Sequence, residues 1–318
     1  MSDLVSLDAV YDARDRIREV VIRTPLVRPS RDGDRATAVK PESLQPTGAF
    51  KLRGAYNAVA ALDVGRRRAG VVAHSSGNHG RAVAWAARAF GVPAVVVTPD
   101  DAPAVKVDGM RALGAELIFV AGEPIEPAEQ VAAERGATLI RPYDAEAVIA
   151  GQGTVGVEIA EDAPDVEVVL VPVGGGGLIS GVALAVAELC PKAKVIGVEP
   201  ELAADASESL ASGRLVEWTG GRARRTIADG LRSSRLGELP WAHVQRYVHE
   251  IVTVTEDEIR AAMRTLALDY RLVAEPSGAV APAAAFHHDA ELPPGRTVAI
   301  VSGGNVEPGV LAEVLGAR

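Results

Sequence analysis

The chain is poor in several residue types, and each shortage narrows what it can be. It has 318 residues but a single cysteine, Cys190, which excludes an internal disulfide and any metal site built from several cysteines. Aromatic residues make up only 4%, so valine, alanine, leucine and isoleucine must form the core. That composition suits buried parallel strands beneath alanine-rich helices. No apolar run is long enough to cross a bilayer.

The chain also has fewer basic residues than acidic ones, 33 against 42. The formal net charge of −9 argues against nucleic acid or an acidic membrane surface as a partner. The N-terminus lacks the basic and then apolar pattern of a secretion signal, so a cytoplasmic protein is expected.

Lysine is rarer than arginine, and there are only five: Lys40, Lys51, Lys106, Lys192 and Lys194. Lys51 follows Pro46-Thr47-Gly48-Ala49-Phe50 and opens an alanine-rich helix. A lysine in an apolar pocket can lose its proton and act as a nucleophile or base, which arginine cannot do. A solvated lysine at a helix start fits this stretch equally well, so the neighbouring motifs must decide.

The rest of the chain alternates strands and helices. A helix over 8–22 and an extended piece to about 40 are followed by expected strands at 70–74, 94–98, 116–120 and 138–141. A second series has strands at 166–173, 195–199, 248–254 and 297–301. Thr255 and Glu258 form a capping-box signature before a helix over 256–269. The pattern predicts an α/β fold with two parallel sheets flanked by helices, the smaller inserted into the larger.

Three polar loops follow predicted strands, where open α/β sheets bind ligands. Ser75-Ser76-Gly77-Asn78-His79-Gly80 offers hydroxyls, an amide and backbone N–H groups at a helix start, which suits a carboxylate. Gly174-Gly175-Gly176-Gly177 can turn successive N–H groups toward one phosphate. Ser302-Gly303-Gly304-Asn305 places a hydroxyl after the last strand.

The glycine loop also comes close to a dinucleotide-binding pattern. The third glycine of that pattern is replaced by Ile179 if the count starts at Gly174, and by Ser180 if it starts at Gly175. Glu199 ends the next strand, near where a ribose-binding acid would sit. An NAD-dependent dehydrogenase is therefore a competing interpretation, but it leaves Lys51 and the loop at 75–80 unexplained. A pyridoxal phosphate enzyme needs a lysine amine, a phosphate site, a substrate carboxylate site and a partner for the pyridine nitrogen.

The motifs together resemble one family nearly end to end. Besides the stretches above, Arg23-Thr24-Pro25-Leu26, the segment 148–154, Ala228-Asp229-Gly230 and Glu275-Pro276-Ser277-Gly278 are similar to the serine/threonine dehydratase and serine racemase family. These are fold-type II pyridoxal phosphate enzymes of the tryptophan synthase β-like architecture. The resemblance implies a large cofactor-binding domain over 1–60 and 146–318, and a small mobile domain on the substrate side over 68–140. It also implies a homodimer and an amino-acid substrate.

The resemblance carries roles onto individual residues. Lys51 is expected to hold the cofactor aldehyde and take the α-proton, and Ser76 matches the serine that faces the opposite side of the α-carbon in racemases. The expected cofactor contacts are Phe50, Lys51, Asn78, Gly174, Gly175, Gly176, Gly177, Glu275 and Ser302. The expected contacts of the substrate carboxylate are Ser75, Ser76, Gly77, Asn78 and His79.

A metal site is implied in the same way. In the family a glutamate, a backbone carbonyl and an acid bind a divalent cation, and Glu199, Ala203 and Asp205 match these positions. Such an oxygen set suits Mg²⁺ or Ca²⁺, although two surface acids at a strand end would look the same.

Two stretches depart from the family pattern. Ala49 stands where many members have serine, and Arg141-Pro142-Tyr143 replaces the more usual His-Pro pair and its successor. Both lie near the expected pocket and bear on substrate choice. Few residues follow Asn305, so the form of threonine dehydratase with a regulatory domain is not expected.

The leading functional prediction is deamination of L-threonine or L-serine to 2-oxobutyrate or pyruvate and ammonia, the activity of an ammonia-lyase. Ser302 can donate to a neutral pyridine nitrogen but cannot keep it protonated, which favours prompt loss of a β-hydroxyl. A racemase of serine or a related amino acid that uses Lys51 and Ser76 is the second hypothesis. A dehydratase of the 3-hydroxyaspartate type stays open, the dehydrogenase ranks below these, and a binding protein that only retains the fold ranks last.

Overall fold

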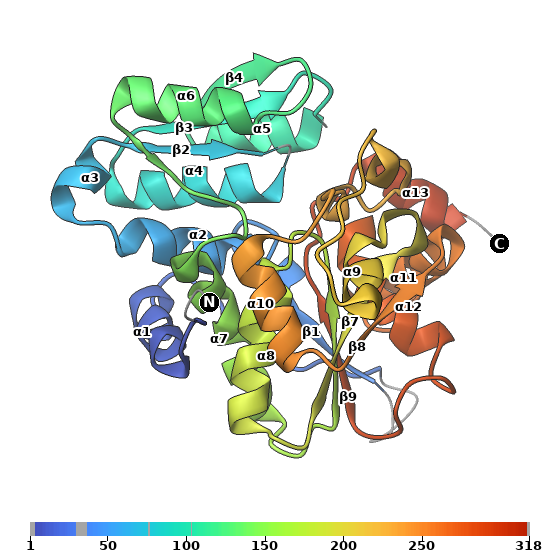
Figure 1. Ribbon diagram of the computed structural model, residues 1–318. Coiled ribbons are helices and arrows are strands. Elements are labelled where there is room, and N and C mark those ends of the chain that lie inside the picture. Colours follow the sequence, from blue (N-terminus) through green and yellow to red (C-terminus); the bar gives the residue numbers. More distant parts are fainter. Residues whose placement is uncertain (1–3, 30–36, 76, 103, 317–318) are drawn as a thin grey trace.

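Two parallel sheets organise the protein (Figure 1). The computed structural model describes residues 4–29, 37–75, 77–102 and 104–316. The five-stranded sheet has the order β1-β9-β6-β7-β8, and the four-stranded sheet has the order β4-β3-β2-β5. Every strand pair in both sheets is parallel. The predicted α/β class is confirmed.

The larger sheet takes strands from both ends of the chain. Its strands are β1 (Ala38–Pro41), β6 (Val168–Pro172), β7 (Lys194–Pro200), β8 (Glu250–Val254) and β9 (Thr297–Val301). The smaller sheet consists of β2 (Val71–His74), β3 (Ala94–Pro99), β4 (Glu116–Val120) and β5 (Thr138–Leu139). All four of these strands lie between β1 and β6 in the chain, as an insertion requires.

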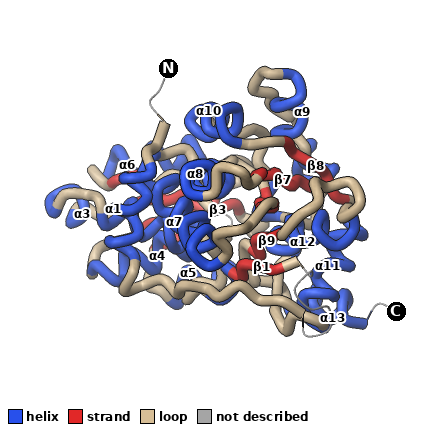
Figure 2. The backbone as a smooth tube through the Cα atoms, turned by 90° about the horizontal axis from the view of Figure 1, so that it is seen from below, coloured by secondary structure: helices blue, strands red, loops and turns tan. Residues whose placement is uncertain are grey.

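The five-stranded sheet is covered on both faces because its side chains alternate. In β6, Val168 and Leu170 join one core cluster, whereas Val169 and Val171 join the other. Helices α11 (Glu256–Leu268), α12 (Pro276–His287) and α13 (Pro308–Gly316) lie on one side. Helices α7 (Glu146–Asp162), α8 (Gly177–Leu189) and α10 (Glu238–Tyr247) lie on the other, and α1 (Leu7–Ile17) packs outside α7 and α8 (Figure 2).

The four-stranded sheet is layered in the same way. Helices α4 (Asn78–Phe90) and α5 (Ala104–Ala112) cover one face, and α6 (Ile125–Arg135) covers the other. Helix α2 (Lys51–Ala60) packs against α4 and against α7, so it touches both units of the fold. Helix α3 (Val64–Arg68) connects α2 to β2.

The segment between β7 and α10 consists mostly of short pieces. It contains η3 (Glu201–Ala203), α9 (Asp205–Ser212), η4 (Arg222–Arg225) and η5 (Asp229–Leu231), and η2 (Glu42–Leu44) follows β1. None of the described helices is long and apolar enough to cross a membrane.

Most predicted elements are found with ends shifted by one to three residues. The capping box is confirmed, because Thr255 accepts from the Glu258 amide while Glu258 accepts from the Thr255 amide. The first helix was predicted too long: it ends at Ile17 rather than at residue 22, and the Val20 amide makes a tighter bond, three residues back, to the Ile17 carbonyl in the turn that follows. Helix α10 was not predicted, since Pro240 near its start reads as a breaker.

Candidate active site

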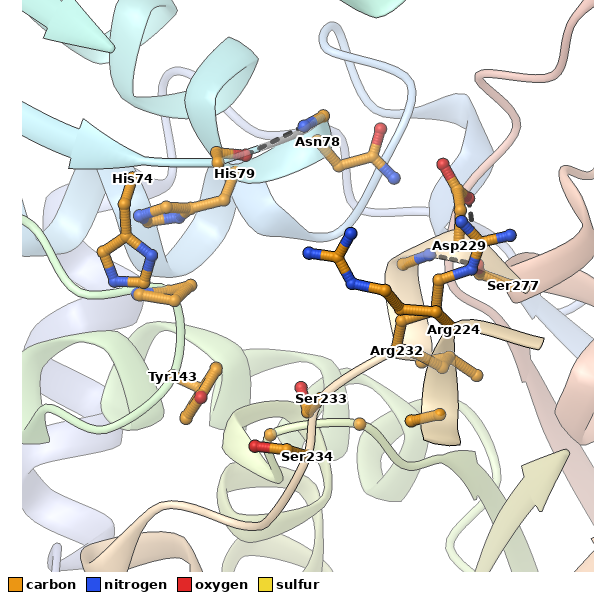
Figure 3. Close-up of a pocket in the computed structure, with 18 of the residues that line it drawn as sticks. His74, Asn78, His79, Tyr143, Arg224, Asp229, Arg232, Ser233, Ser234 and Ser277 are labelled. Atoms are coloured by element: carbon orange, nitrogen blue, oxygen red, sulfur yellow. Dashed lines mark hydrogen bonds between the residues drawn. The ribbon is translucent and has the colours of Figure 1, made fainter. Parts of the chain in front are cut away.

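A cavity of about 700 Å³ opens between the two sheets. The loops after β2, β6 and β9 all reach it, so the carboxyl ends of strands from both sheets meet there. In Figure 3, His74 and His79 lie at one end of the cavity and Arg224 and Arg232 at the other. Predicted site residues on its wall include Phe50, Lys51, Ser75, Gly77, Asn78, His79, Gly174, Gly175, Gly176, Gly177, Glu275 and Ser302.

Lys51 is the first residue of α2, and its amine lies inside the cavity. Its Nζ donates to the Pro142 carbonyl at 2.8 Å and lies 5.1 Å from the centre of the Phe50 ring. Burial without a neighbouring carboxylate lowers the pKa of the Lys51 amine to about 8. The fraction of neutral amine near neutral pH is therefore far larger than for a solvated lysine, which favours a nucleophilic role.

The start of α2 is fastened to the loop after β9. The Phe50 amide donates to the Ser302 carbonyl at 3.0 Å, and the Gly304 amide donates to the Gly48 carbonyl at 2.9 Å. Ala49 is fully buried against Gly303, with which it forms a backbone bridge. A methyl group fits this contact, and the departure to alanine leaves no hydroxyl beside Lys51.

A buried ionic cluster lies two residues beyond Lys51. Arg53, with no exposed surface, donates from Nε to Glu42 at 2.7 Å and from Nη1 to Glu158 at 2.6 Å. Lys40 Nζ is 2.7 Å from Glu158. Burial alone would raise the pKa of Glu42, but the Arg53 charge holds it below its ordinary value. The cluster fixes α2 to β1 and α7, and with α2 the origin of the Lys51 side chain.

The glycine loop offers an anion site. Gly174, Gly175, Gly176 and Gly177 are buried before α8, and none of their amides donates to any residue in the described part of the chain. A side chain would not fit, because a Cβ on Gly177 would lie 2.8 Å from the Tyr143 Cβ, and one on Gly175 would overlap the Tyr143 ring. Four buried amides without acceptors at a helix start fit a phosphate group.

Tyr143 and Ser233 border the glycine loop (Figure 3). The Tyr143 phenol is hydrogen-bonded to Ser233, and burial raises its pKa. Tyr143 belongs to a stretch that departs from the family pattern. Its aromatic ring lies beside Gly175, and its Cβ lies beside Gly177.

Ser302 and Asn78 offer the two remaining polar contacts expected for the cofactor ring. Ser302 Oγ is buried and donates to the Ser277 carbonyl at 3.2 Å. Asn78, the first residue of α4, donates from Nδ2 to Glu275 and accepts from Asn305 Nδ2 at 2.8 Å. With Lys51 and the glycine loop, this donor set fits a group that carries a phosphate, an aldehyde and a pyridine nitrogen.

The loop after β2 and the start of α4 carry the residues expected to contact the substrate carboxylate. Ser75 Oγ accepts from the Gly77 amide at 3.0 Å, and His79 Nε2 donates to the Ile140 carbonyl at 2.7 Å. Burial and the Lys51 charge lower the pKa of His79 to about 3, so its ring is neutral. Ser76 lies outside the described residues.

The expected metal residues lie away from the cavity, at the end of β7. Glu199 accepts from the amides of Ala206 and Ser207 at 3.2 and 2.7 Å. Asp205 Oδ2 is buried and has no hydrogen-bond partner among the described residues. Burial raises the pKa of both carboxyl groups, for Asp205 to about 7. The described residues contain no group of three or more metal-ligating side chains, but a pair of carboxylates with the Ala203 carbonyl would not form such a group.

Several cavity residues were not predicted from the sequence. They are His74, Lys106, Arg224, Asp229 and Arg232, whereas Tyr143 was expected near the pocket. Burial and the charge of Arg141 lower the pKa of His74 to about 4, so it is neutral beside Lys51. Lys106 gave the one usable signal, because lysine is so rare in this chain.

Comparison with known proteins gives matches over almost the whole chain. A family model described as pyridoxal-phosphate dependent enzyme matches residues 17–303. The L-threonine ammonia-lyase of Thermotoga maritima is 42% identical, over 98% of this chain and 78% of that protein. The L-threo-3-hydroxyaspartate ammonia-lyase of Saccharomyces cerevisiae is 42% identical, over 94% of this chain and 92% of that protein.

The fold comparison agrees with the sequence comparison. The solved structure of maize serine racemase superposes with a TM-score of 0.92 at 37% identity, covering 98% of this chain and 97% of that one. These similar proteins carry different activities on one architecture.

Proposed function

The chain belongs to the family of pyridoxal-phosphate dependent enzymes, and on that premise we propose that it is an ammonia-lyase acting on L-threonine or L-serine. The observation that carries the proposal is Lys51: a half-buried amine with a lowered pKa that opens into the same cavity as four unpaired glycine amides. Family membership also decides against the dehydrogenase interpretation of the glycine loop.

The chain's own residues supply binding, orientation and proton transfer. Pyridoxal phosphate, when bound, supplies an electron sink for the charge left by removal of the α-proton. The amides of Gly174–Gly177 would bind its phosphate, and Ser302 would donate to the pyridine nitrogen without protonating it. Lys51 would hold the aldehyde and, as a free amine, would accept the α-proton of the substrate. The β-hydroxyl would leave as water, and addition of water to the released enamine would give a 2-oxo acid and ammonia.

Ser75, Gly77 and His79 surround the substrate carboxylate in this proposal, together with Ser76. The ring of His79 cannot donate to the carboxylate, because its single N–H at Nε2 is donated to the Ile140 carbonyl, so His79 would contribute its backbone amide.

The test is formation of 2-oxo acid by purified holoenzyme. Wild type is expected to release 2-oxobutyrate from L-threonine or pyruvate from L-serine, with a visible absorption band from lysine-bound cofactor. Lys51→Ala is expected to lose both the band and the activity. A visible band that persists in Lys51→Ala means that another lysine holds the cofactor, and the assignment is then wrong.

A specific observation favours L-threo-3-hydroxyaspartate as a second candidate substrate. Arg232 lies at the cavity, where its guanidinium donates to the Thr226 carbonyl at 2.7 Å. Among the described residues no acidic side chain pairs with it, whereas Arg224 is paired with Glu123 at 2.7 Å. An unpaired guanidinium suits a second carboxylate on the substrate.

One panel of assays separates the candidates. Release of oxaloacetate from 3-hydroxyaspartate, faster than 2-oxo acid from threonine or serine, would favour the second candidate, and Arg232→Gln should then raise KM for that substrate alone. D-serine formed from L-serine without 2-oxo acid would identify a racemase. Inactivity toward all of these substrates would contradict the proposal.

Mg²⁺ or Ca²⁺ is proposed at Glu199, Ala203 and Asp205, supported by the partnerless buried oxygen of Asp205. A homodimer and a cytoplasmic location are retained as proposals from the family resemblance.

A further inference from the structure

Lys106 spans the cavity from one unit of the fold to the other. It lies in α5, beside the four-stranded sheet, yet its ammonium forms an ion pair with Asp229 and lies 3.3 Å from Glu275 Oε2. Asp229 is in η5, and Glu275 precedes α12 against the five-stranded sheet. The lysine stem passes directly over Gly77, where a Cβ would lie 2.6 Å from Lys106 Cδ.

Glu275 is the end of a hydrogen-bonded chain that also crosses between the units. Arg81 donates to Asn305 Oδ1 at 2.8 Å, and Asn305 donates to Asn78 Oδ1 at 2.8 Å. Asn78 in turn donates to Glu275 Oε1. Arg81 and Asn78 belong to α4, whereas Asn305 and Glu275 belong to the other unit.

The ends of this chain fix its direction. An arginine can only donate and an ionised carboxylate can only accept, whereas each asparagine amide between them can be turned around. Arg81 therefore turns Asn305 Oδ1 toward itself, and Asn305 Nδ2 donates to the Thr47 carbonyl at 2.9 Å as well as to Asn78, so the Asn78 NH₂ group faces Glu275. An ionised Glu275 is the strong acceptor for that group. The Glu275 side chain is 1% exposed, and burial raises its pKa, while the Lys106 ammonium acts in the opposite sense. Without that ammonium, a protonated Glu275 would hold the Asn78 NH₂ group less firmly.

We propose that Lys106 is a positioning residue that latches the four-stranded unit over the cavity and, through Glu275, holds the Asn78 amide in place. The NH₂ group of Asn78 has one hydrogen left after its bond to Glu275, and that hydrogen would be free to meet the phenolic oxygen of a bound cofactor. The inference rests on the proposed function for the cofactor's identity, but not on which amino acid is the substrate.

The latch explains why the site is built from both units. When Lys106 is drawn away with α5, Glu275 loses its counter-charge at the same moment as Asn78 leaves Asn305. The donor to the cofactor is thus correctly oriented only in the closed arrangement, which ties the reaction to closure.

The test first replaces Lys106 with cysteine and then rebuilds a side chain of similar length by alkylating that cysteine. In Lys106→Cys holoenzyme, the visible band of bound cofactor should shift and kcat should fall roughly 100-fold, the scale of a small misplacement near the reacting centre. Alkylation with 2-bromoethylamine rebuilds an ammonium at about the length of lysine and should restore band and kcat. Iodoacetamide adds a neutral group of similar size and should restore neither. The only other cysteine, Cys190, is buried, and alkylated wild type gives the background.

Two further measurements separate the parts of the inference. Lys106→Cys and Glu275→Gln should each shift the visible band. The double variant should shift it no further than the more damaging single variant, because both residues act through the same hydrogen-bonded chain. Amide exchange in α4 and α5 of the holoenzyme should rise in Lys106→Cys, whereas surface Lys192→Met should change neither exchange nor band.

Several outcomes would overturn the proposal. Recovery with the neutral adduct would reduce Lys106 to a packing residue, and additive effects of Lys106→Cys and Glu275→Gln would disconnect the two. Unchanged exchange would remove the latch. Because the spectrum and exchange need no substrate, they decide the matter even if wild type proves inactive toward threonine and serine, the result that would instead contradict the proposed function.

Discussion

At the scale of single residues, Lys51 combines an apolar surrounding with one weak anchor. The Pro142 carbonyl accepts from its Nζ at 2.8 Å, the neighbouring His74 and His79 are neutral, and no carboxylate in the described part of the chain forms an ion pair with its ammonium. A carbonyl can accept from the neutral amine as well as from the charged one. The lysine is therefore kept in place without being kept protonated.

The pH dependence of cofactor attachment follows from this. Only the neutral amine attacks an aldehyde, and burial sets the pKa of Lys51 at about 8 rather than at its ordinary value of 10.5. The rate at which the visible band appears in apoenzyme should rise between pH 7 and 9 and level off above. The measurement is stopped-flow absorbance at saturating cofactor, with noncovalent binding to Lys51→Ala as control. A midpoint near 10 would contradict the assignment.

Gly175 carries a second prediction at this scale. Its Cβ position is taken by the Tyr143 ring, and its amide is one of the four that lack an acceptor among the described residues and are proposed to bind the phosphate. Gly175→Ala should destabilise the fold by about 1–3 kcal/mol through overpacking, and should weaken cofactor binding.

Calorimetry and cofactor titration check both effects of Gly175→Ala. Gly309→Ala is the matched control, because nothing lies within 4 Å of its Cβ position. Unchanged cofactor affinity in Gly175→Ala would move the phosphate elsewhere.

At the scale of elements, helix α2 is held by buried ion pairs as well as by apolar side chains. Arg53 sits between Glu42 and Glu158, each contributed by a different element. Arg53→Met should lower the free energy of unfolding by about 3–5 kcal/mol, because the buried Glu42 loses its ion-pair partner and Glu158 keeps only Lys40. Denaturant unfolding measures this, and Arg14→Met, at a half-exposed ion pair, should change little.

A double variant keeps the Arg53 prediction decidable if the single variant fails to fold. Arg53→Met combined with Glu42→Gln removes the stranded charge of Glu42, while Glu158 keeps its ion pair with Lys40, so the double variant should be more stable than Arg53→Met alone. If it is less stable, the Glu42 carboxylate is not the cause of the loss.

The junction of β7 and α9 carries the metal prediction. Addition of Mg²⁺ or Ca²⁺ to chelator-treated protein should raise its melting temperature, because the cation neutralises two buried acids whose pKa values are raised. Asp205→Asn should abolish that rise. The same rise in Asp205→Asn would place the cation elsewhere, and none with any divalent ion in wild type would remove the site.

Local signals explain which elements and site residues could be predicted. The capping box at Thr255 and the Gly174–Gly177 loop act within a few residues of chain, so the sequence carries their structural meaning directly. Lys106 and Asp229 could not be assigned in this way, because their roles arise only where two units meet. Helix α10 was not predicted because proline usually breaks helices. Pro240 is tolerated here because it lies in the first turn of α10, where it packs at Gly176.

At the scale of the whole molecule, the cavity lies where two separately built sheets meet. The expected domains, 1–60 with 146–318 and 68–140, remain a proposal that the arrangement of the sheets supports. Helix α2 connects the two units, and so do the ion pairs of Lys106 with Asp229 and Glu275, so motion of one unit would be transmitted to the other there. The architecture could be predicted from strand and helix alternation, but the position of one unit relative to the other depends on contacts such as these.

The pairing of β1 with β9 also bears on how the protein is made. Ala38 is aligned with Val298, and the Phe50 amide is bonded to Ser302, so the first and last strands of the sheet must meet before Lys51 is positioned. The strands of the inserted unit over 71–139 pair only with one another, so this unit can fold while the ribosome is still synthesising the rest. A nascent chain therefore carries no assembled lysine site until its final strand emerges, and its reactive amine cannot engage cellular aldehydes in a half-built pocket.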